Sequence, residues 1–277
     1  MYEPSQHPPL PSGAPTPPGA GAASTQPQFY IRRTPPTYTR ILIGINLAVF
    51  VLTIVYGYFV YGVWNGPEDV RVLVDMGAKV NELIMQGQYW RLLTAMFLHI
   101  GVIHLLFNLY ALYALGPMVE GYFGHGRFLA IYFIGGLCGS LASYAFSPAI
   151  SAGASGAIFG LAGAITVYFL RYRDNFGRQG RAILQNMLVV IAINLVFGMT
   201  MRGIDNWGHI GGLVGGAVVA WGVLPRYKTP AVVRLGPQEL ETEVRLTSEM
   251  IWVFAIAALL IAGVIFVTQR GAPTQFQ

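Results

Sequence analysis

A serine and a histidine, each at the start of a long apolar stretch, are the residues of this sequence best suited to chemistry. Ser155 lies within Gly153-Ala154-Ser155-Gly156, and His209 follows Gly208 two apolar stretches later. A serine hydroxyl becomes a nucleophile when an adjacent base takes its proton, and histidine is the base used most often. We therefore predict a hydrolytic site in which Ser155 attacks and His209 transfers the proton.

The composition indicates that this chemistry would take place in lipid. Hydrophobic residues make up 54% of the 277 residues, charged residues only 10%, and the mean hydropathy is +0.53. These values exclude an ordinary soluble domain. The net charge of +5 is scattered over separate short loops, so no nucleic-acid partner is indicated. The single cysteine, Cys138, excludes an intrachain disulfide.

The apolar stretches are long enough to predict seven membrane-spanning helices, since one crossing needs about 20 residues. One stretch is double length and is expected to turn near Ser147-Pro148. The stretches are 41–70 (interrupted only by Glu68 and Asp69), 92–119, 128–170, 182–201, 206–225 and 250–269. The predicted fold class is therefore an all-α polytopic membrane protein with a six-helix core and one additional C-terminal helix.

This reading divides the chain into five regions. Residues 1–37 hold ten of the 17 prolines and no apolar run, so we predict a disordered tail. This tail lacks the layout of a cleavable signal peptide, and the first span is expected to serve as the insertion signal. The remaining predicted regions are the six-helix core (38–225), a charged linker (226–248), the seventh helix (249–269) and a short external tail (270–277).

The basic residues predict the orientation, because Lys and Arg favour the cytoplasmic side of short loops. With the N-terminus inside, twelve of the 17 basic residues lie on that side and five lie outside. We therefore expect a cytoplasmic N-terminus. The helices that begin at Ser155 and at Asn206 would then both start on the outer side, with Ser155 and His209 at similar depth.

Small residues near both candidates predict close helix packing. Gly156 and Gly160 follow Ser155, and Gly212 and Gly216 follow His209, which forms small-xxx-small faces that let two helices approach closely. The same pattern is common in spans that only pack. Phe159, one turn after Ser155, could stack on the His209 ring, although a plain packing role fits equally well.

The second span offers donors for the oxyanion that forms when a serine attacks a carbonyl. His104 and Asn108 are four residues apart and share a helical face, and the Ser155 amide is free at a helix start. His99 would point about 140° away on the same helix and should serve another purpose. Without the serine and histidine, an interhelical hydrogen bond would be the favoured explanation for His104 and Asn108.

Other hydrolytic designs fit the sequence less well. Asp205, four residues before His209, is the only nearby acid, and we interpret it as a solvated loop charge, which favours a two-residue mechanism. The soluble-hydrolase motif Gly-x-Ser-x-Gly is absent, because Ala157 stands two residues after Ser155. No His-Glu-x-x-His metal motif occurs. We expect no metal and no other cofactor.

With these residues in place, the stretch from Ile41 to Pro225 resembles the rhomboid family of intramembrane serine proteases. The motifs occur in the family order. They are Trp90-Arg91, then His99, His104 and Asn108, then Glu120 with Arg127, then Gly153-Ala154-Ser155-Gly156, and then His209 with Gly212 and Gly216.

The resemblance implies roles for these residues. Ser155 would be the nucleophile and His209 the base, with His104 and Asn108 beside the oxyanion hole. It implies architectural roles for Trp90-Arg91, His99, Glu120 and Arg127, and it implies that the stretch 65–91 folds partly into the membrane surface. Two positions depart from the family pattern: Gly208 replaces the usual Ala, and Phe159 replaces a frequent Tyr.

The predicted function is that of an intramembrane serine endopeptidase that cleaves transmembrane segments of other membrane proteins near the outer membrane face. The expected location is a bacterial inner membrane, and the oligomeric state is left open. One rival is a transporter or channel, which should carry acidic groups within its spans. Another is a catalytically silent relative that binds membrane proteins as a recognition or chaperone factor, against which the intact Ser155 and His209 argue.

Overall fold

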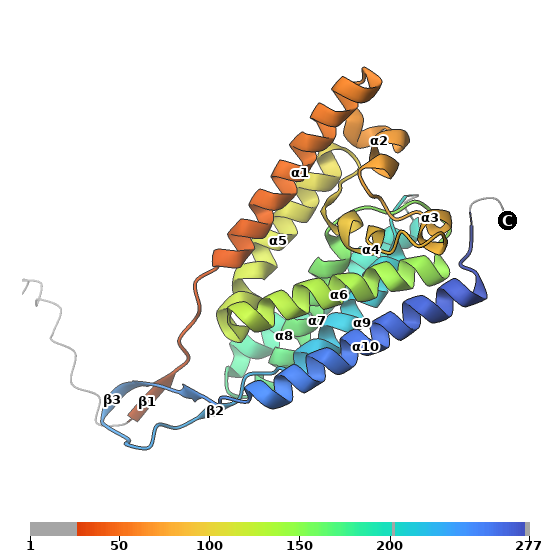
Figure 1. Cartoon of the computed structure of the whole chain (residues 1–277). Coiled ribbons are helices and arrows are strands. Elements are labelled where there is room, and N and C mark those ends of the chain that lie inside the picture. Colours follow the sequence, from red (N-terminus) through yellow and green to blue (C-terminus); the bar gives the residue numbers. More distant parts are fainter. Residues whose placement is uncertain (1–26, 201–202, 275–277) are drawn as a thin grey trace, which may run out of the picture. The chain divides into compact units, whose positions relative to one another are not determined.

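The computed structural model describes residues 27–200 and 203–274, which are mostly helical (Figure 1). Six helices within these residues are long and apolar enough to cross a membrane. They are α1 (Thr37–Tyr61), α5 (Gly101–Phe123), α6 (His125–Phe146), α7 (Ser155–Tyr172), α8 (Gly177–Thr200) and α10 (Leu246–Arg270). The predicted all-α polytopic class is confirmed.

The sixth of the seven predicted spans, residues 206–225, forms the shorter helix α9 (Asn206–Gly222) of 17 residues. The count of six plus one spans stays a prediction. The double-length stretch divides where the Ser147-Pro148 pair predicted, because α6 ends at Phe146 and α7 begins at Ser155.

The first apolar stretch continues beyond the helix that it contains. The stretch runs to Val70, whereas α1 ends at Tyr61 and Gly62 follows with φ of 67°. That left-handed conformation favours glycine and ends the helix. The chain then forms short elements: η1 (Gly66–Glu68), α2 (Val70–Asp75), α3 (Asn81–Met85), α4 (Arg91–Thr94) and η2 (Ala95–Phe97).

The centre of the helical part consists of α6, α7 and α9, which pack against one another more extensively than any other helices. Glycines make this possible. A Cβ at Gly216 would overlap the Gly160 backbone, and one at Gly135 would lie 3.3 Å from the Cα atoms of both. The predicted close approach of the helices that carry Ser155 and His209 is confirmed.

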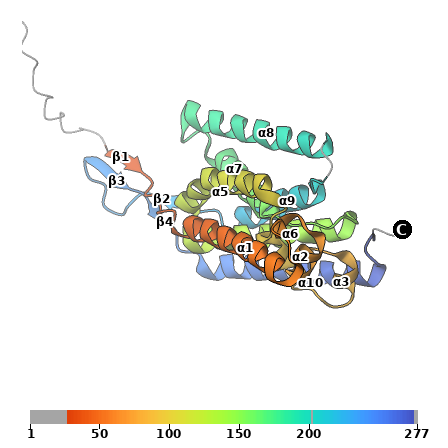
Figure 2. The same ribbon diagram turned by 90° about the horizontal axis from the view of Figure 1, so that it is seen from above.

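The last helix, α10, packs along α6 and α9, and Figure 2 shows it on the opposite side of these helices from α8. An ion pair fixes its start, because Arg127 on α6 donates to both carboxylate oxygens of Glu249 at 2.8 and 2.7 Å. The bidentate pair between Arg127 and Glu249 is stronger than a single charged contact. Trp252 on α10 also donates to the Val218 carbonyl of α9 at 3.0 Å.

Within the described residues, a separate small unit comprises residues 27–31 and 227–241. In it, β1 (Pro27–Tyr30) pairs in parallel with β3 (Gly236–Glu239), in the register Pro27 to Gly236. The predicted disordered tail lies mostly outside the described residues. Two further short strands are β2 (Tyr227–Lys228) and β4 (Glu241–Thr242). The sequence analysis predicted none of these strands.

We expect Gly212→Ala to destabilise the protein and lower its activity. A Cβ at Gly212 would overlap the Gly156 carbonyl group, 2.7 Å from its carbon, and backbone atoms cannot move aside without separating α7 from α9. Overpacking of this kind costs about 1–3 kcal/mol. Thermal unfolding in detergent should show a lower midpoint.

Gly44→Ala is the matched control, because nothing lies within 4 Å of a Cβ at this helical glycine. It should leave stability unchanged or raise it by about 0.5–1 kcal/mol, since alanine favours the helix. Equal midpoints for Gly212→Ala and the unaltered protein would contradict the importance of this contact.

Candidate active site

Ser155 is the first residue of α7 and is half-buried. The loop before it is held by the Gly153 N–H, which donates to the Ala95 carbonyl at 2.8 Å. Gly153 has φ of 144°, a conformation that favours glycine. Among the described residues the Ser155 N–H has no hydrogen-bond partner, as expected for the first amide of a helix.

His209 lies in the first turn of α9, is 9% exposed, and has a buried Nδ1 without a partner among the described residues. The start of this helix is capped by Asp205, whose Oδ1 accepts from the Gly208 N–H at 3.0 Å. The interpretation of Asp205 as a solvated loop charge is therefore wrong. An aspartate before a helix satisfies amides that would otherwise lack acceptors.

The rings of Phe159 and His209 are stacked, with centroids 4.3 Å apart and planes inclined by 11°. The backbones behind them are close as well, since a Cβ at Gly156 would lie 3.4 Å from the Gly208 carbonyl oxygen. Ser155 and His209 thus occupy the first turns of two touching helices. No hydrogen bond joins the two side chains within the described residues, and such bonds are often loose before substrate binds.

His104 also lies beside the serine. A Cβ at Gly153 would be 2.9 Å from His104 Nε2 and 3.6 Å from Ser155 Oγ, so both groups flank the bare glycine. His104 Nδ1 accepts from the Ile100 N–H at 3.3 Å. A neutral ring that accepts at Nδ1 carries its proton on Nε2, so the nitrogen near the serine is a donor.

Asn108 is 6% exposed and donates from Nδ2 to the His104 carbonyl at 2.9 Å, one turn earlier in α5. Its Oδ1 is buried without a partner among the described residues. The amide therefore uses one of its two N–H groups within its own helix. The second N–H can donate a hydrogen bond to a substrate oxygen.

The prediction for His99 was wrong in its geometry. It placed His99 on the same helix as His104 and pointing away, whereas α5 begins only at Gly101, which has φ of 78°. His99 lies before the helix, 1% exposed, and its ring contacts the His104 ring edge-on at 5.4 Å between centroids. His99 therefore packs behind the histidine that faces Ser155.

The Trp90-Arg91 pair joins the short elements before α5. Arg91 is 4% exposed and donates from Nη1 to the Val74 and Ala78 carbonyls at 2.6 and 3.1 Å. Trp90 is about half exposed, and the Arg91 guanidinium lies 4.7 Å from its ring centroid. Burial lowers the pKa of Arg91, and the guanidinium is still charged because its usual value is so high.

Glu120 on α5 is fully buried and serves the start of α1. Its carboxylate accepts from the Tyr38 and Thr39 amides at 2.8 and 2.9 Å and from the Thr39 hydroxyl at 2.7 Å. His125 Nδ1 lies 2.6 Å from the same carboxylate. A residue more than 80 positions away in the sequence thus caps the first helix.

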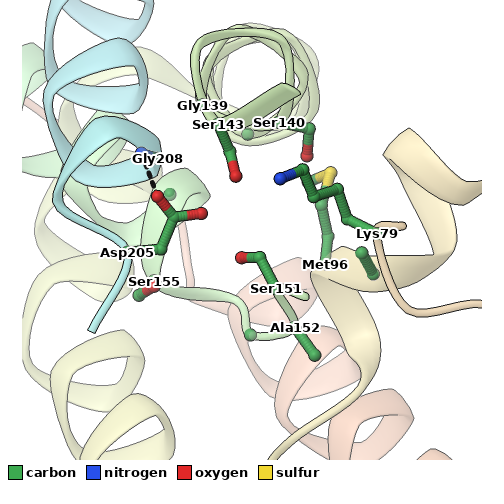
Figure 3. Close-up of a pocket in the computed structure, with 14 residues that line it drawn as sticks. Lys79, Met96, Gly139, Ser140, Ser143, Ser151, Ala152, Ser155, Asp205 and Gly208 are labelled. Atoms are coloured by element: carbon green, nitrogen blue, oxygen red, sulfur yellow. Dashed lines mark hydrogen bonds between the residues drawn. The ribbon is translucent and has the colours of Figure 1, made fainter. Parts of the chain in front are cut away.

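A cavity of about 30 Å³ opens beside Ser155, and Figure 3 shows polar groups directed into it from several elements. Its polar side chains are Lys79, Ser140, Ser143, Ser151, Ser155 and Asp205. The volume exceeds the roughly 10–15 Å³ that one water requires. The described residues hold no cluster of three or more His, Cys, Asp or Glu side chains that could bind a metal.

Lys79 is the unexpected member of this lining, because it is a lysine that is only 1% exposed. Burial lowers its pKa to about 8, while the charges of Asp205 and Glu82 oppose that shift. The sequence analysis did not single out Lys79, Ser140, Ser143 or Ser151, since no local motif marks them.

The sequence also matches a known family. The profile of the Rhomboid domain covers residues 86–226, which include the two helices that carry Ser155 and His209. The chain belongs to the rhomboid family. This rhomboid is therefore a multi-pass integral membrane protein, in keeping with its six long apolar helices.

Several relatives resemble this rhomboid. It is 48% identical over 185 residues to "Rhomboid protease GluP" of Bacillus subtilis (67% of this chain, 34% of that protein). It is 41% identical over 158 residues to "RHOMBOID-like protein 7" of Arabidopsis thaliana (56% and 50%). It is 33% identical over 203 residues to "Rhomboid protease AarA" of Providencia stuartii (64% and 72%). The chain thus spans a third to a half of the first two relatives.

For this rhomboid we expect Glu120→Gln to lower stability by about 1.5–3 kcal/mol, the scale for hydrogen bonds to a charged group. The glutamine NH₂ group would face backbone N–H groups that now donate hydrogen bonds to the Glu120 carboxylate, so at least one of these bonds would be lost. The thermal midpoint in detergent checks the effect. Glu68→Gln, at an exposed glutamate of η1, should leave the thermal midpoint unchanged, and equal losses for both variants would refute the capping role.

Proposed function

We propose that this rhomboid is an intramembrane serine endopeptidase that uses Ser155 and His209 as a catalytic dyad. The observation that carries the proposal is the contact of the first turns of α7 and α9, where Phe159 stacks on the His209 ring. That stacking orients the imidazole without a carboxylate partner. The names of two relatives, GluP and AarA, which are called rhomboid proteases, support the same reaction.

In the proposed mechanism Ser155 Oγ attacks the carbonyl carbon of a peptide bond while His209 accepts the serine proton. His209 then donates that proton to the departing amine, which leaves an ester between Ser155 and the acyl half of the substrate. A water then attacks the ester carbon while His209 accepts a proton from it. His209 passes this proton to Ser155 Oγ as the ester bond breaks, which releases the acyl half as a carboxylic acid. The cavity beside Ser155 has room for such a water.

Three donors are proposed to stabilise the oxyanion: the Ser155 N–H, the His104 Nε2–H and the second N–H of Asn108. The first lacks a partner among the described residues, and the second flanks Gly153 together with Ser155 Oγ. Donors that are in place before the reaction cost no reorganisation in the transition state.

The proposed substrates are transmembrane segments of other membrane proteins. A helix hides its peptide bonds in its own hydrogen-bond ladder, so a substrate must unwind locally before Ser155 can attack. The excess of Arg and Lys on one set of loops supports a cytoplasmic N-terminus, with cleavage near the outer face. A bacterial inner membrane is the proposed location.

We expect Ser155→Ala to abolish cleavage of a single-span reporter by the purified protein in detergent, because no nucleophile remains. The measurement is the appearance of product over time, with thermal unfolding as a check of folding. Ser248→Ala is the matched control, since Ser248 is exposed and its hydroxyl donates only to the Arg245 carbonyl at the start of α10.

The second candidate function, binding of membrane proteins without cleavage, draws on the missing hydrogen bond between Ser155 and His209 in the described structure. It predicts no product from the unaltered protein and equal capture of the reporter by Ser155→Ala. Loss of product in Ser155→Ala alone would decide for the protease.

Asn108→Ala should lower turnover about tenfold to a thousandfold, the usual scale for one oxyanion donor. Substrate affinity should change little, because the donor acts mainly in the transition state. The kcat and KM values of the purified variant check both expectations. Asn46→Ala removes a buried asparagine of α1 that donates to its own helix at 2.8 Å, and it should leave kcat unchanged. Equal kcat for both variants would remove Asn108 from the mechanism.

A further inference from the structure

The segment 79–81, which leads into α3 and includes its first residue, holds the loop that precedes the nucleophile. Lys79 and Ser151 form an antiparallel bridge, with N–H to carbonyl distances of 2.9 and 3.1 Å. The Lys79 ammonium also donates to the Ser147 and Ala149 carbonyls at 2.7 and 3.0 Å. One residue therefore makes four hydrogen bonds to a five-residue loop that ends four positions before Ser155.

Asn81 extends this contact. Its Nδ2 donates to the Ser147 carbonyl at 3.0 Å and to the Tyr144 carbonyl at 3.3 Å, at the end of α6. Asn81 is 1% exposed. A partly buried carbonyl that loses its donor has given up water without gaining another partner, so removal of either side chain should loosen the path of the loop.

The same asparagine reaches the chain beyond the last helix. Asn81 Nδ2 lies 2.6 Å from the Pro273 carbonyl, three residues after α10 ends. Ala272 is 4% exposed and packs in a cluster with Ile84, Leu92 and Tyr144. The end of α10 is therefore packed against both α3 and α6, next to the contact that Asn81 makes with the loop.

We propose that Lys79 and Asn81 are positioning residues for Ser155, and that the segment after α10 supports them. The inference rests on the proposed role of Ser155 as the nucleophile. The proposal gives α10 a structural role. The segment after α10 holds Asn81, and Asn81 and Lys79 together hold the loop 147–151. This loop in turn positions the start of α7. None of these groups is among those proposed to attack the substrate or to bind the oxyanion.

Because Lys79 is charged, the proposal predicts how the activity depends on pH. The charged groups that act on Lys79 are Asp205, before α9, and Glu82, on α3, and α6 presents only serine hydroxyls to the cavity. As the pH rises past about 8 the ammonium loses its charge. Its bonds to the loop carbonyls then weaken, so activity should fall on the alkaline side.

The test compares kcat, KM and the pH profile of reporter cleavage for Lys79→Met, Lys79→Arg and Asn81→Ala. Lys79→Met and Asn81→Ala should lower kcat on the order of tenfold to a hundredfold, since a small misplacement of a reacting group costs that much. KM should change less than about twofold, because the substrate-binding surface is intact.

The pH profile separates positioning from plain stability. The alkaline decline should disappear in Lys79→Met, and it should also disappear in Lys79→Arg, which keeps its charge throughout and retains more activity than Lys79→Met. The controls are Arg71→Met, on α2, and Asn65→Ala, in the loop after α1, both at exposed positions. These should match the unaltered protein in kcat and profile.

Support by the segment after α10 is tested with Ala272→Leu, which should push Pro273 from Asn81 and lower kcat at unchanged KM. Ile261→Leu, at an exposed site of α10, is its control. Unchanged kcat in Ala272→Leu would overturn the supporting role.

Unchanged kcat in Lys79→Met and Asn81→Ala would overturn the positioning role. So would a loss that follows the thermal midpoint with the alkaline decline intact. An unaltered protein that cleaves no better than Ser155→Ala would instead refute the proposed function, which keeps the two failures distinct.

Discussion

The close contact between glycines where α6, α7 and α9 meet is the constraint on which the rest of this structure depends. Gly156 and Gly212 bring two backbones so close that one added carbon would overlap a carbonyl. In lipid such contact is a main source of helix association, because apolar side chains gain little by leaving the hydrocarbon. Ser155 and His209 stand on these two helices, so the geometry of the site follows directly from the packing.

Outside this centre, hydrogen bonds and ion pairs of polar side chains hold α1, the short elements before α5, and α10. Glu120 caps α1, and Arg91 donates hydrogen bonds to backbone carbonyls of the segment before α5. Arg127 fixes the start of α10 through Glu249. Each is a buried or nearly buried charge with several partners, which is the condition under which a charge can be kept inside a protein.

Local pattern predicted much of the fold and the pairing of Ser155 with α9, because helical periodicity and glycine spacing are visible along the chain. It failed for His99, since only the left-handed Gly101 shows that α5 starts later. It could not find Lys79, whose partners are backbone carbonyls 68 and 70 positions away. A hydrogen bond to a backbone carbonyl does not depend on the type of the residue that carries it, so no pattern in the sequence marks it. The pairing of strands β1 and β3 also rests on backbone groups and was missed for the same reason.

The shortness of α9 has a consequence for the surrounding lipid. Its 17 residues rise about 26 Å at roughly 1.5 Å per residue, less than the hydrocarbon thickness of about 30 Å. A short span is accommodated by thinning of the adjacent bilayer or by polar atoms at its end drawing headgroups inward. The hydrophobic mismatch at α9 would thus bring bulk water towards His209 without any pore through the protein.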